Sequence, residues 1–263
     1  MKIRNSKRFG FTLTEVFIVV GIVGVIAAMT IPTLLSKTGS TKYRAQFIKT
    51  LSTLNQVGRL SKASYNFDFA DVKKCTSTTD NPNSDITICA MFNGTLTGHN
   101  ISSNAPNGYS PTGSIHSSAH GQIPSGMPIL ESRRHYLTLA DGSLVVFNKN
   151  MSGCQLPPGM GLTYDKEQTQ PDGTTKMVKA LTLSSACYGF IDVNGTTPPN
   201  KEVTCSDKAT STYNVLNCNV PNTAENSTDI YPIVFHDGVV EPATNAAISV
   251  LKSESNSDVL KNY

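Results

Sequence analysis

The chain has 263 residues and a mass of 28.2 kDa, enough for one or two domains with a hydrophobic core. Ser, Thr and Asn account for 77 residues, only 16% of residues are charged and Trp is absent, which is more typical of a loop-rich extracellular β protein than of a cytosolic enzyme. Four of the 22 basic residues lie within the first ten positions, and the remaining 18 face 19 acidic residues. This balance excludes nucleic-acid binding through a general basic field.

The first 31 residues combine a basic start with an apolar segment. Residues 11–31 read FTLTEVFIVVGIVGVIAAMTI, and Glu15 is the single charged residue among these 21. As a helix the segment is about 31 Å long, which matches the hydrocarbon core of a bilayer. With the basic residues before it, the positive-inside rule predicts a single membrane span with a cytoplasmic N-terminus and everything after Ile31 exported.

Two interpretations of this segment differ in how the chain is processed. A secretory signal peptide cleaved after Ala27 or Ala28 would leave a conventionally secreted soluble binding protein, and an uncleaved segment would anchor one in the membrane. Glu15 argues against a simple signal, because a carboxylate inside an apolar segment costs about 2.5–3.5 kcal/mol on insertion. A cut between Gly10 and Phe11 would create an α-amine about one helical turn from Glu15, which a second chain displaced by one turn could bring into contact.

The run KRFG followed by FTLTEV, an apolar helix and Pro32 near its outer end resembles the leader and methylation segment of type IV prepilins and type II secretion pseudopilins. The resemblance covers about residues 1–60. It implies that a prepilin peptidase removes residues 1–10 by cutting after Gly10 and then methylates Phe11. Glu15 would neutralise the Phe11 amine of a neighbouring subunit.

The resemblance also implies partners and a role. The chain would first be a single-pass precursor in a bacterial inner membrane. Other pilin subunits and an inner-membrane assembly platform would then build it into a periplasmic or cell-surface filament. A retractile pilus, a secretion pseudopilus and a DNA-uptake fibre are all compatible with this segment. The 253 residues that follow the leader exceed the length of many major pilins, which favours a minor, accessory subunit.

A second helical pattern follows the apolar segment. Pro32 and Gly39 predict a kink or local melting over residues 32–40. Apolar residues then recur at spacings of three and four, which predicts an amphipathic helix to about Ser64 that packs on the rest of the protein: Tyr43, Phe47, Ile48, Leu51 and Leu54. We therefore expect an N-terminal helix over residues 11–64 and a globular head over residues 65–263.

The head reads as a β structure with one long loop. Residues 93–128 are rich in Gly, Ser, Asn and Pro without periodicity, which predicts a loop insertion. Two β-hairpins are predicted around Asp141-Gly142 and Asp237-Gly238, and residues 175–183 and 188–193 are β-prone. The expected fold class is α+β, with a long N-terminal helix, half transmembrane and half amphipathic, packed on an antiparallel sheet in a pilin-like manner.

Six cysteines lie beyond the apolar segment, an even number that favours structural disulfides in an oxidising compartment. The sequence contains no C-x-x-C motif, so it does not indicate a cysteine metal site. Sequence alone permits 15 pairings. Short spacing favours local loops, namely Cys75 with Cys89 and Cys205 with Cys218, which leaves Cys154 with Cys187.

Only one motif suggests a cofactor. Asp192-Val193-Asn194-Gly195 alternates oxygen ligands before a turn glycine, so that Asp192 and Asn194, with Asp207 or Asp229, could bind Ca²⁺. A plain turn explains the same residues. His116 and His120 lie in a Ser-rich stretch that predicts solvated loop histidines. The chain has no G-x-S-x-G, H-E-x-x-H or Gly-rich phosphate loop, so we do not expect an enzyme.

Overall fold

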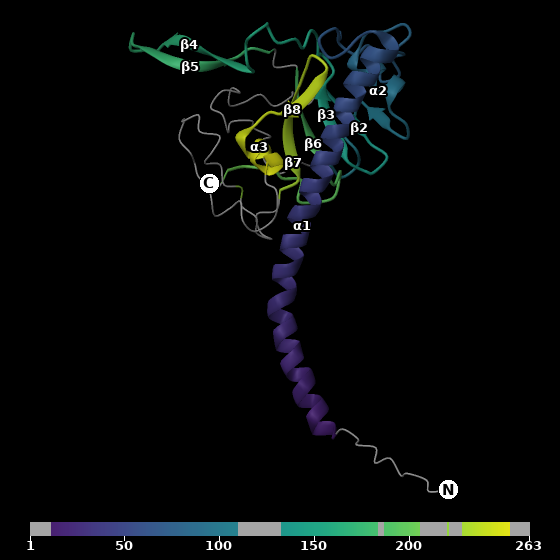
Figure 1. Cartoon of the computed structure of the whole chain (residues 1–263), viewed down its shortest axis with the longest axis vertical. Coiled ribbons are helices and arrows are strands. Elements are labelled where there is room, and N and C mark those ends of the chain that lie inside the picture. Colours follow the sequence, from purple (N-terminus) through teal and green to yellow (C-terminus); the bar gives the residue numbers. More distant parts are fainter. Residues whose placement is uncertain (1–11, 110–132, 184–186, 206–219, 221–227, 253–263) are drawn as a thin grey trace, which may run out of the picture.

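A 53-residue helix, α1 (Leu13–Tyr65), runs along the head and extends far beyond it (Figure 1). The computed structural model describes residues 12–109, 133–183, 187–205, 220 and 228–252; within these ranges, side chains are described except at 29–40, 163–166, 176, 178–181 and 245. The helix is continuous through residues 32–40, so the predicted local melting there is wrong. Its axis bends gently along its length (Figure 1), as the axes of long helices generally do.

The expected transmembrane half of this helix is not supported. Among the described residues, no helix combines the length and the apolar character needed to cross a membrane. The predicted span at 11–31 and the single-pass inner-membrane placement with a cytoplasmic N-terminus are therefore wrong, and with them the fold class as expected.

The head is built on a six-stranded sheet in which every neighbouring pair is antiparallel. The strand order is β1-β2-β3-β6-β7-β8. The bounds of these strands are Asn100–Ser102 for β1, Arg134–Thr138 for β2, Leu144–Asn148 for β3, Tyr188–Asp192 for β6, Ile230–His236 for β7 and Val239–Pro242 for β8. A separate two-stranded sheet, β4 (Thr163–Thr169) with β5 (Thr175–Leu181), projects from the head (Figure 1). The chain is thus a mixed α+β protein.

Both predicted hairpins are confirmed. β2 pairs with β3 across Asp141-Gly142, and β7 pairs with β8 across Asp237-Gly238, where Asp237 adopts a φ of 47°. Such left-handed backbone is what two-residue hairpin turns require and what Asp and Gly tolerate. Strands β5 and β6 also occupy the runs predicted to be β-prone.

Four further elements escaped prediction. Helix α2 (Ile88–Thr95) begins just before Cys89, β1 lies inside the predicted loop insertion at residues 93–128, β4 precedes the predicted β-prone run at 175–183, and helix α3 (Asn245–Lys252) follows β8. Residues 110–128 of that insertion are outside the described part of the chain. Each missed element is short, so its sequence carries too little periodicity to identify it.

The hydrophobic core lies between the second half of α1 and the sheet. The Phe47 ring stacks on Tyr231 of β7 at a centroid distance of 4.3 Å. Asn55 bonds the edge strand β8 twice, since its Nδ2 donates to the Val240 carbonyl at 3.0 Å and its Oδ1 accepts from the Val240 amide at 2.8 Å. Gly58 allows α1 to approach the turn between β7 and β8 closely, because a Cβ at this position would lie only 2.7 Å from the Gly238 carbonyl oxygen. The helix therefore covers an edge that would otherwise expose backbone groups.

Two leucines on α1 provide a matched test of this packing. Leu54 is fully buried, whereas Leu60 is 49% exposed. We expect Leu54→Ala to lower the free energy of unfolding by about 2–5 kcal/mol, because it removes buried methyl groups and leaves a cavity. Leu60→Ala should cost less than about 1 kcal/mol. Urea denaturation of both variants measures the difference, and equal losses would contradict the placement of α1 on the sheet.

Candidate functional site

The most unusual surface of the protein is the first part of α1, residues 13–28, which we call the apolar N-terminal segment. In Figure 1 it belongs to the end of the helix that lies away from the sheet. Its large apolar side chains are 50–75% exposed: Leu13, Val16, Phe17, Ile18, Val19, Val20, Ile22, Val23, Val25 and Ile26. A contiguous exposed apolar surface of this kind marks an interaction site.

The start of this segment is fixed by a reciprocal cap. Thr12 Oγ1 accepts a hydrogen bond from the Glu15 amide at 3.3 Å, and the Thr12 amide donates to Glu15 Oε2 at 2.8 Å. Hydrogen bonds from the backbone and the side chain of Thr12 lower the pKa of Glu15. Glu15 is therefore ionised and directed back to the positive end of the helix.

Sequence analysis identified Glu15 but missed Thr12. The spacing Thr-x-x-Glu before an apolar run is the signature of a capping box and could have revealed it. Gly10 and Phe11 lie outside the described residues, so the predicted cleavage point has no structural description. Both members of the cap follow that point and would remain in the processed chain.

Two of the predicted disulfides are confirmed. Cys75 pairs with Cys89 and Cys154 with Cys187, with Cα atoms 5.7 Å and 5.8 Å apart. Cys205 is also disulfide-bonded, while its predicted partner Cys218 falls in a range that the structure does not describe. Disulfides of this kind persist in oxidising compartments.

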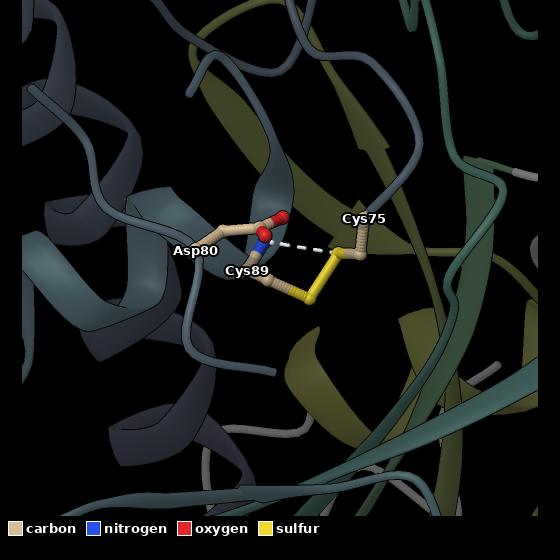
Figure 2. Close-up of side chains that lie close together, drawn as sticks. All are labelled: Cys75, Asp80 and Cys89. Carbon is tan, nitrogen blue, oxygen red and sulfur yellow. Dashed lines mark hydrogen bonds between the residues drawn. A yellow bond between two sulfur atoms is a disulfide. The ribbon is translucent and has the colours of Figure 1, made fainter. Parts of the chain in front are cut away.

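A carboxylate lies directly beside the first disulfide (Figure 2). Cys75, Asp80 and Cys89 are the only group of three or more potential metal ligands that the described residues bring together. The two sulfur atoms are bonded to each other, and the Cys89 amide donates to Cys75 Sγ at 3.2 Å. A disulfide offers no thiolate, so the sulfurs are not metal ligands here.

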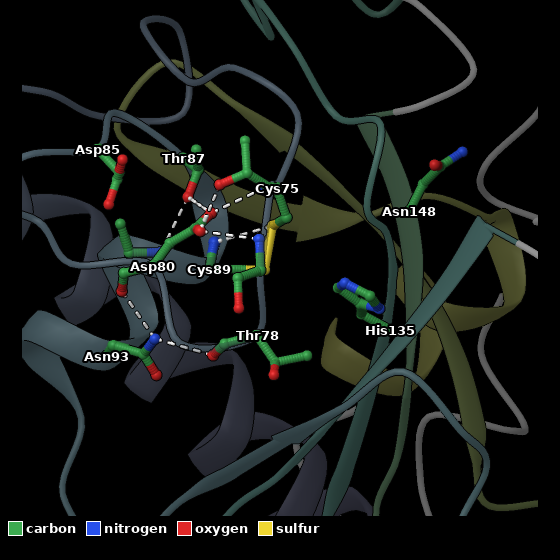
Figure 3. Close-up of a disulfide and its surroundings, with 12 residues drawn as sticks. Cys75, Thr78, Asp80, Asp85, Thr87, Cys89, Asn93, His135 and Asn148 are labelled. Atoms are coloured by element: carbon green, nitrogen blue, oxygen red, sulfur yellow. Dashed lines mark hydrogen bonds between the residues drawn. A yellow bond between two sulfur atoms is a disulfide. The ribbon is translucent and has the colours of Figure 1, made fainter.

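The Asp80 carboxylate is already satisfied by the surrounding loop (Figure 3). Its oxygens accept from Thr76 Oγ1 at 2.6 Å, Thr87 Oγ1 at 2.7 Å and the Ser77 amide at 2.8 Å. Burial alone would raise the pKa of Asp80, but these hydrogen bonds outweigh burial and lower it. Asp80 therefore orders the disulfide loop and the start of α2, since Thr87 caps that helix.

The predicted Ca²⁺ ligands lie at the end of β6. Asp192 is the last residue of this strand and Asn194 follows it in the loop. Asp229, just before β7, is a neighbour of Asp192, and both carboxylates are fully buried. Asp207 and the two histidines of the predicted loop, His116 and His120, belong to ranges without structural description.

Burial dominates the electrostatics of this acidic pair. It raises the pKa of Asp192 to about 8, with a further contribution from the nearby Asp229 charge. Burial also raises the pKa of Asp229, although that carboxylate accepts hydrogen bonds from the Asn200 and Lys201 amides at 2.9 Å and 2.7 Å. Within the described part of the chain, neither carboxylate forms an ion pair.

No family model, no curated protein and no solved structure matches the chain.

Proposed function

We propose that this chain is a structural subunit, a pilin or pseudopilin, of a type IV pilus or type II secretion filament. The observation that carries the proposal is the apolar N-terminal segment, which exposes ten large apolar side chains on a helix that continues beyond the head. We further propose that a prepilin peptidase cuts after Gly10 and methylates Phe11. Other pilin subunits and an assembly platform are the proposed partners.

The energetics favour association of this segment with other helices. Burying a fully exposed Val, Leu, Ile or Phe side chain contributes about 1.5–3 kcal/mol. Ten such residues, each already about half exposed, give association a driving force comparable with the roughly 5–15 kcal/mol that stabilises a whole domain. The apolar residues surround the helix instead of forming one stripe, which is the pattern of a helix buried on all sides.

Further copies of the same segment fit this surface best. The segment is continuous with a helix that is anchored in the head only through its second half, so several copies can bundle side by side with their heads outside. Glu15 adds specificity, because an ionised carboxylate in a dry bundle needs a positive partner. The processed α-amine of a neighbouring Phe11 would provide it and would set the axial register.

Variants at the cap separate a charge role of Glu15 from a helix-capping role. Glu15→Gln retains a hydrogen-bond acceptor for the Thr12 amide but removes the charge. Thr12→Ala removes the hydroxyl that accepts from the Glu15 amide and retains the charge. We expect Glu15→Gln to lower the amount of subunit in sheared filaments at least tenfold, and Thr12→Ala to lower it less than threefold.

The measurement needs cells that lack the wild-type subunit. Quantitative immunoblots of sheared and cell-bound fractions give the incorporated share, and mass spectrometry of the mature N-terminus reports cleavage and methylation. Normal filament yield with Glu15→Gln would contradict the charge role. A mature N-terminus at Ala28 would contradict the filament function itself, since residues 13–27 would then be removed, and would favour a secreted binding protein.

A further inference from the structure

The imidazole ring of His236 lies between two carboxylates at the end of the β7–β8 hairpin. Its Nδ1 is 3.0 Å from Asp237 Oδ2 and its Nε2 is 3.4 Å from Glu241 Oε2. His236 pairs with Val239 in the ladder, so Glu241, two residues further along β8, is its diagonal neighbour on the same face. His236 is only 7% exposed, so the ring has little access to water and depends on these two partners.

Only a charged imidazolium satisfies both contacts. A neutral imidazole carries one N–H, so its other nitrogen would turn a lone pair toward a carboxylate oxygen. Burial lowers the pKa of His236, but the hydrogen bonds with Glu241 and Asp237 outweigh burial and raise this pKa. The hydrogen bond with His236 lowers the pKa of Glu241 in turn. His236 therefore keeps its proton to a higher pH than an unperturbed histidine, whose pKa is about 6.5.

The turn that carries Asp237 joins several parts of the head. The Asp237 amide donates to the Cys154 carbonyl at 2.7 Å, and the Asp237 carbonyl accepts from the Phe69 amide at 2.9 Å. On β8, the backbone of Val240 exchanges two hydrogen bonds with Asn55 of α1. The hairpin therefore connects α1, the segment that follows α1 and the loop that contains the second disulfide.

No second titrating group complicates this place within the described part of the chain. Asp237 and Glu241 are the charged residues that act on the His236 ring. The contacts that other elements make with the hairpin come from residues that do not titrate near neutral pH: Asn55 and Gly58 of α1, Phe69 after it, and Leu156 and the disulfide-bonded Cys154 before β4. The proton on His236 is therefore the charge that changes here.

We propose that His236 is a pH-sensitive clasp, whose imidazolium holds Glu241 of β8 and Asp237 of the turn together and so keeps this edge of the sheet docked on α1. Loss of the proton removes the charge attraction and leaves a lone pair facing a carboxylate, so the hairpin opens from α1 more often. The clasp is tight in acid and loosens in alkali. The inference goes beyond the proposed filament function and does not depend on it.

The direction of the pH dependence follows from the raised pKa. The folded chain binds the His236 proton more tightly than the unfolded chain. The stability that the clasp contributes is thus fully present below about pH 6.5 and is lost as the pH rises through the raised pKa. Asp192 and Asp229, whose pKa values burial raises, also make stability fall with rising pH. They lie at the opposite end of β7, so a comparison of the parent with a His236 variant removes their effect.

Protonation is measured on the unaltered chain, so that a misfolded variant cannot obscure the outcome. Long-range ¹H–¹⁵N spectra report the state of both ring nitrogens, and the signal that His236→Gln loses identifies the ring. We expect His236 to titrate above about pH 6.5. His99 and His135, whose pKa values burial lowers, should titrate below it and serve as internal controls. A His236 ring that titrates at or below the pH of these two would overturn the proposal.

Thermal unfolding at pH 7 and pH 9 measures what the clasp contributes. His236→Gln can still donate to one carboxylate but carries no charge at either pH. We expect the Tm of the parent to fall by at least about 2 °C more than the Tm of this variant between the two pH values. His135→Gln, a change at another buried histidine, should show the parental fall, because burial lowers the pKa of His135.

Hydrogen exchange of the Val240 amide, which donates to Asn55, reports opening of the edge itself. Its protection, corrected for the intrinsic exchange rate, should fall at least about threefold from pH 7 to pH 9 in the parent and stay constant in His236→Gln. Equal losses of Tm in the parent and His236→Gln, or Val240 protection that does not change with pH in the parent, would contradict the clasp.

Discussion

Val23→Glu should abolish assembly of the subunit into filaments while leaving the head folded. Val23 is 58% exposed in the middle of the apolar N-terminal segment and makes no contribution to the core of the head. In a bundle of such segments a carboxylate at this position would be buried without a partner, which is among the most destabilising changes known. Because every subunit carries the change, the cost repeats at each contact, and we expect the filament fraction to fall by more than tenfold.

Sheared-filament yield and thermal unfolding of the purified chain measure the two halves of this expectation. Val23→Leu is the matched control and should assemble normally, because it keeps an apolar side chain of similar size. Leu60→Glu is a second control and should also assemble normally, since Leu60 is a half-exposed apolar residue on the same helix but beside the head. A normal yield of Val23→Glu filaments would show that the segment is not an assembly surface.

Removal of the disulfides should cost the head a large part of its stability. The bonds close loops with sequence separations of 14 and 33 residues. The loop-entropy relation gives a stabilisation of about 3 kcal/mol for the shorter loop and about 4 kcal/mol for the longer one. We therefore expect the double change Cys154→Ala with Cys187→Ala to destabilise more than Cys75→Ala with Cys89→Ala.

Urea denaturation of the two double variants, compared with the oxidised parent, measures this order. All four sulfur-bearing residues are at most 9% exposed, so each change also removes buried contacts and the losses should reach at least the loop-entropy values. Losses below about 1 kcal/mol for both pairs would contradict a structural role of the bonds.

Local sequence signals predicted a good part of this fold. Turn pairs such as Asp237-Gly238 fix hairpins within a few residues, and the spacing of Phe47, Leu51 and Leu54 defines the buried face of α1. Short spacing also predicted the Cys75–Cys89 disulfide, and Cys154–Cys187 was the pair that remained. These features depend on residues close together in the chain, which is why sequence patterns contain them.

Features that depend on distant residues could not be predicted in the same way. The three residues of β1 become a strand only through their pairing with β2, more than 30 positions later. Asn200 lies near Asp192 because the Asp229 carboxylate, almost 30 positions later, accepts hydrogen bonds from the backbone amides of Asn200 and Lys201. The apolar run at the N-terminus had the opposite effect, since a segment of 21 residues with one charge predicted a membrane span that the described helix does not provide.

Site-specific cross-linking tests the assembly role of the apolar N-terminal segment most directly. A photoreactive amino acid at Phe17, which is 69% exposed, should join copies of this chain when intact filaments are irradiated, giving a ladder of multimers. The same group at Met177, which is 57% exposed on the projecting hairpin, should give far fewer multimers. A ladder from position 17 that depends on Glu15 is the predicted result; monomers alone from position 17 in irradiated filaments would contradict assembly through this segment.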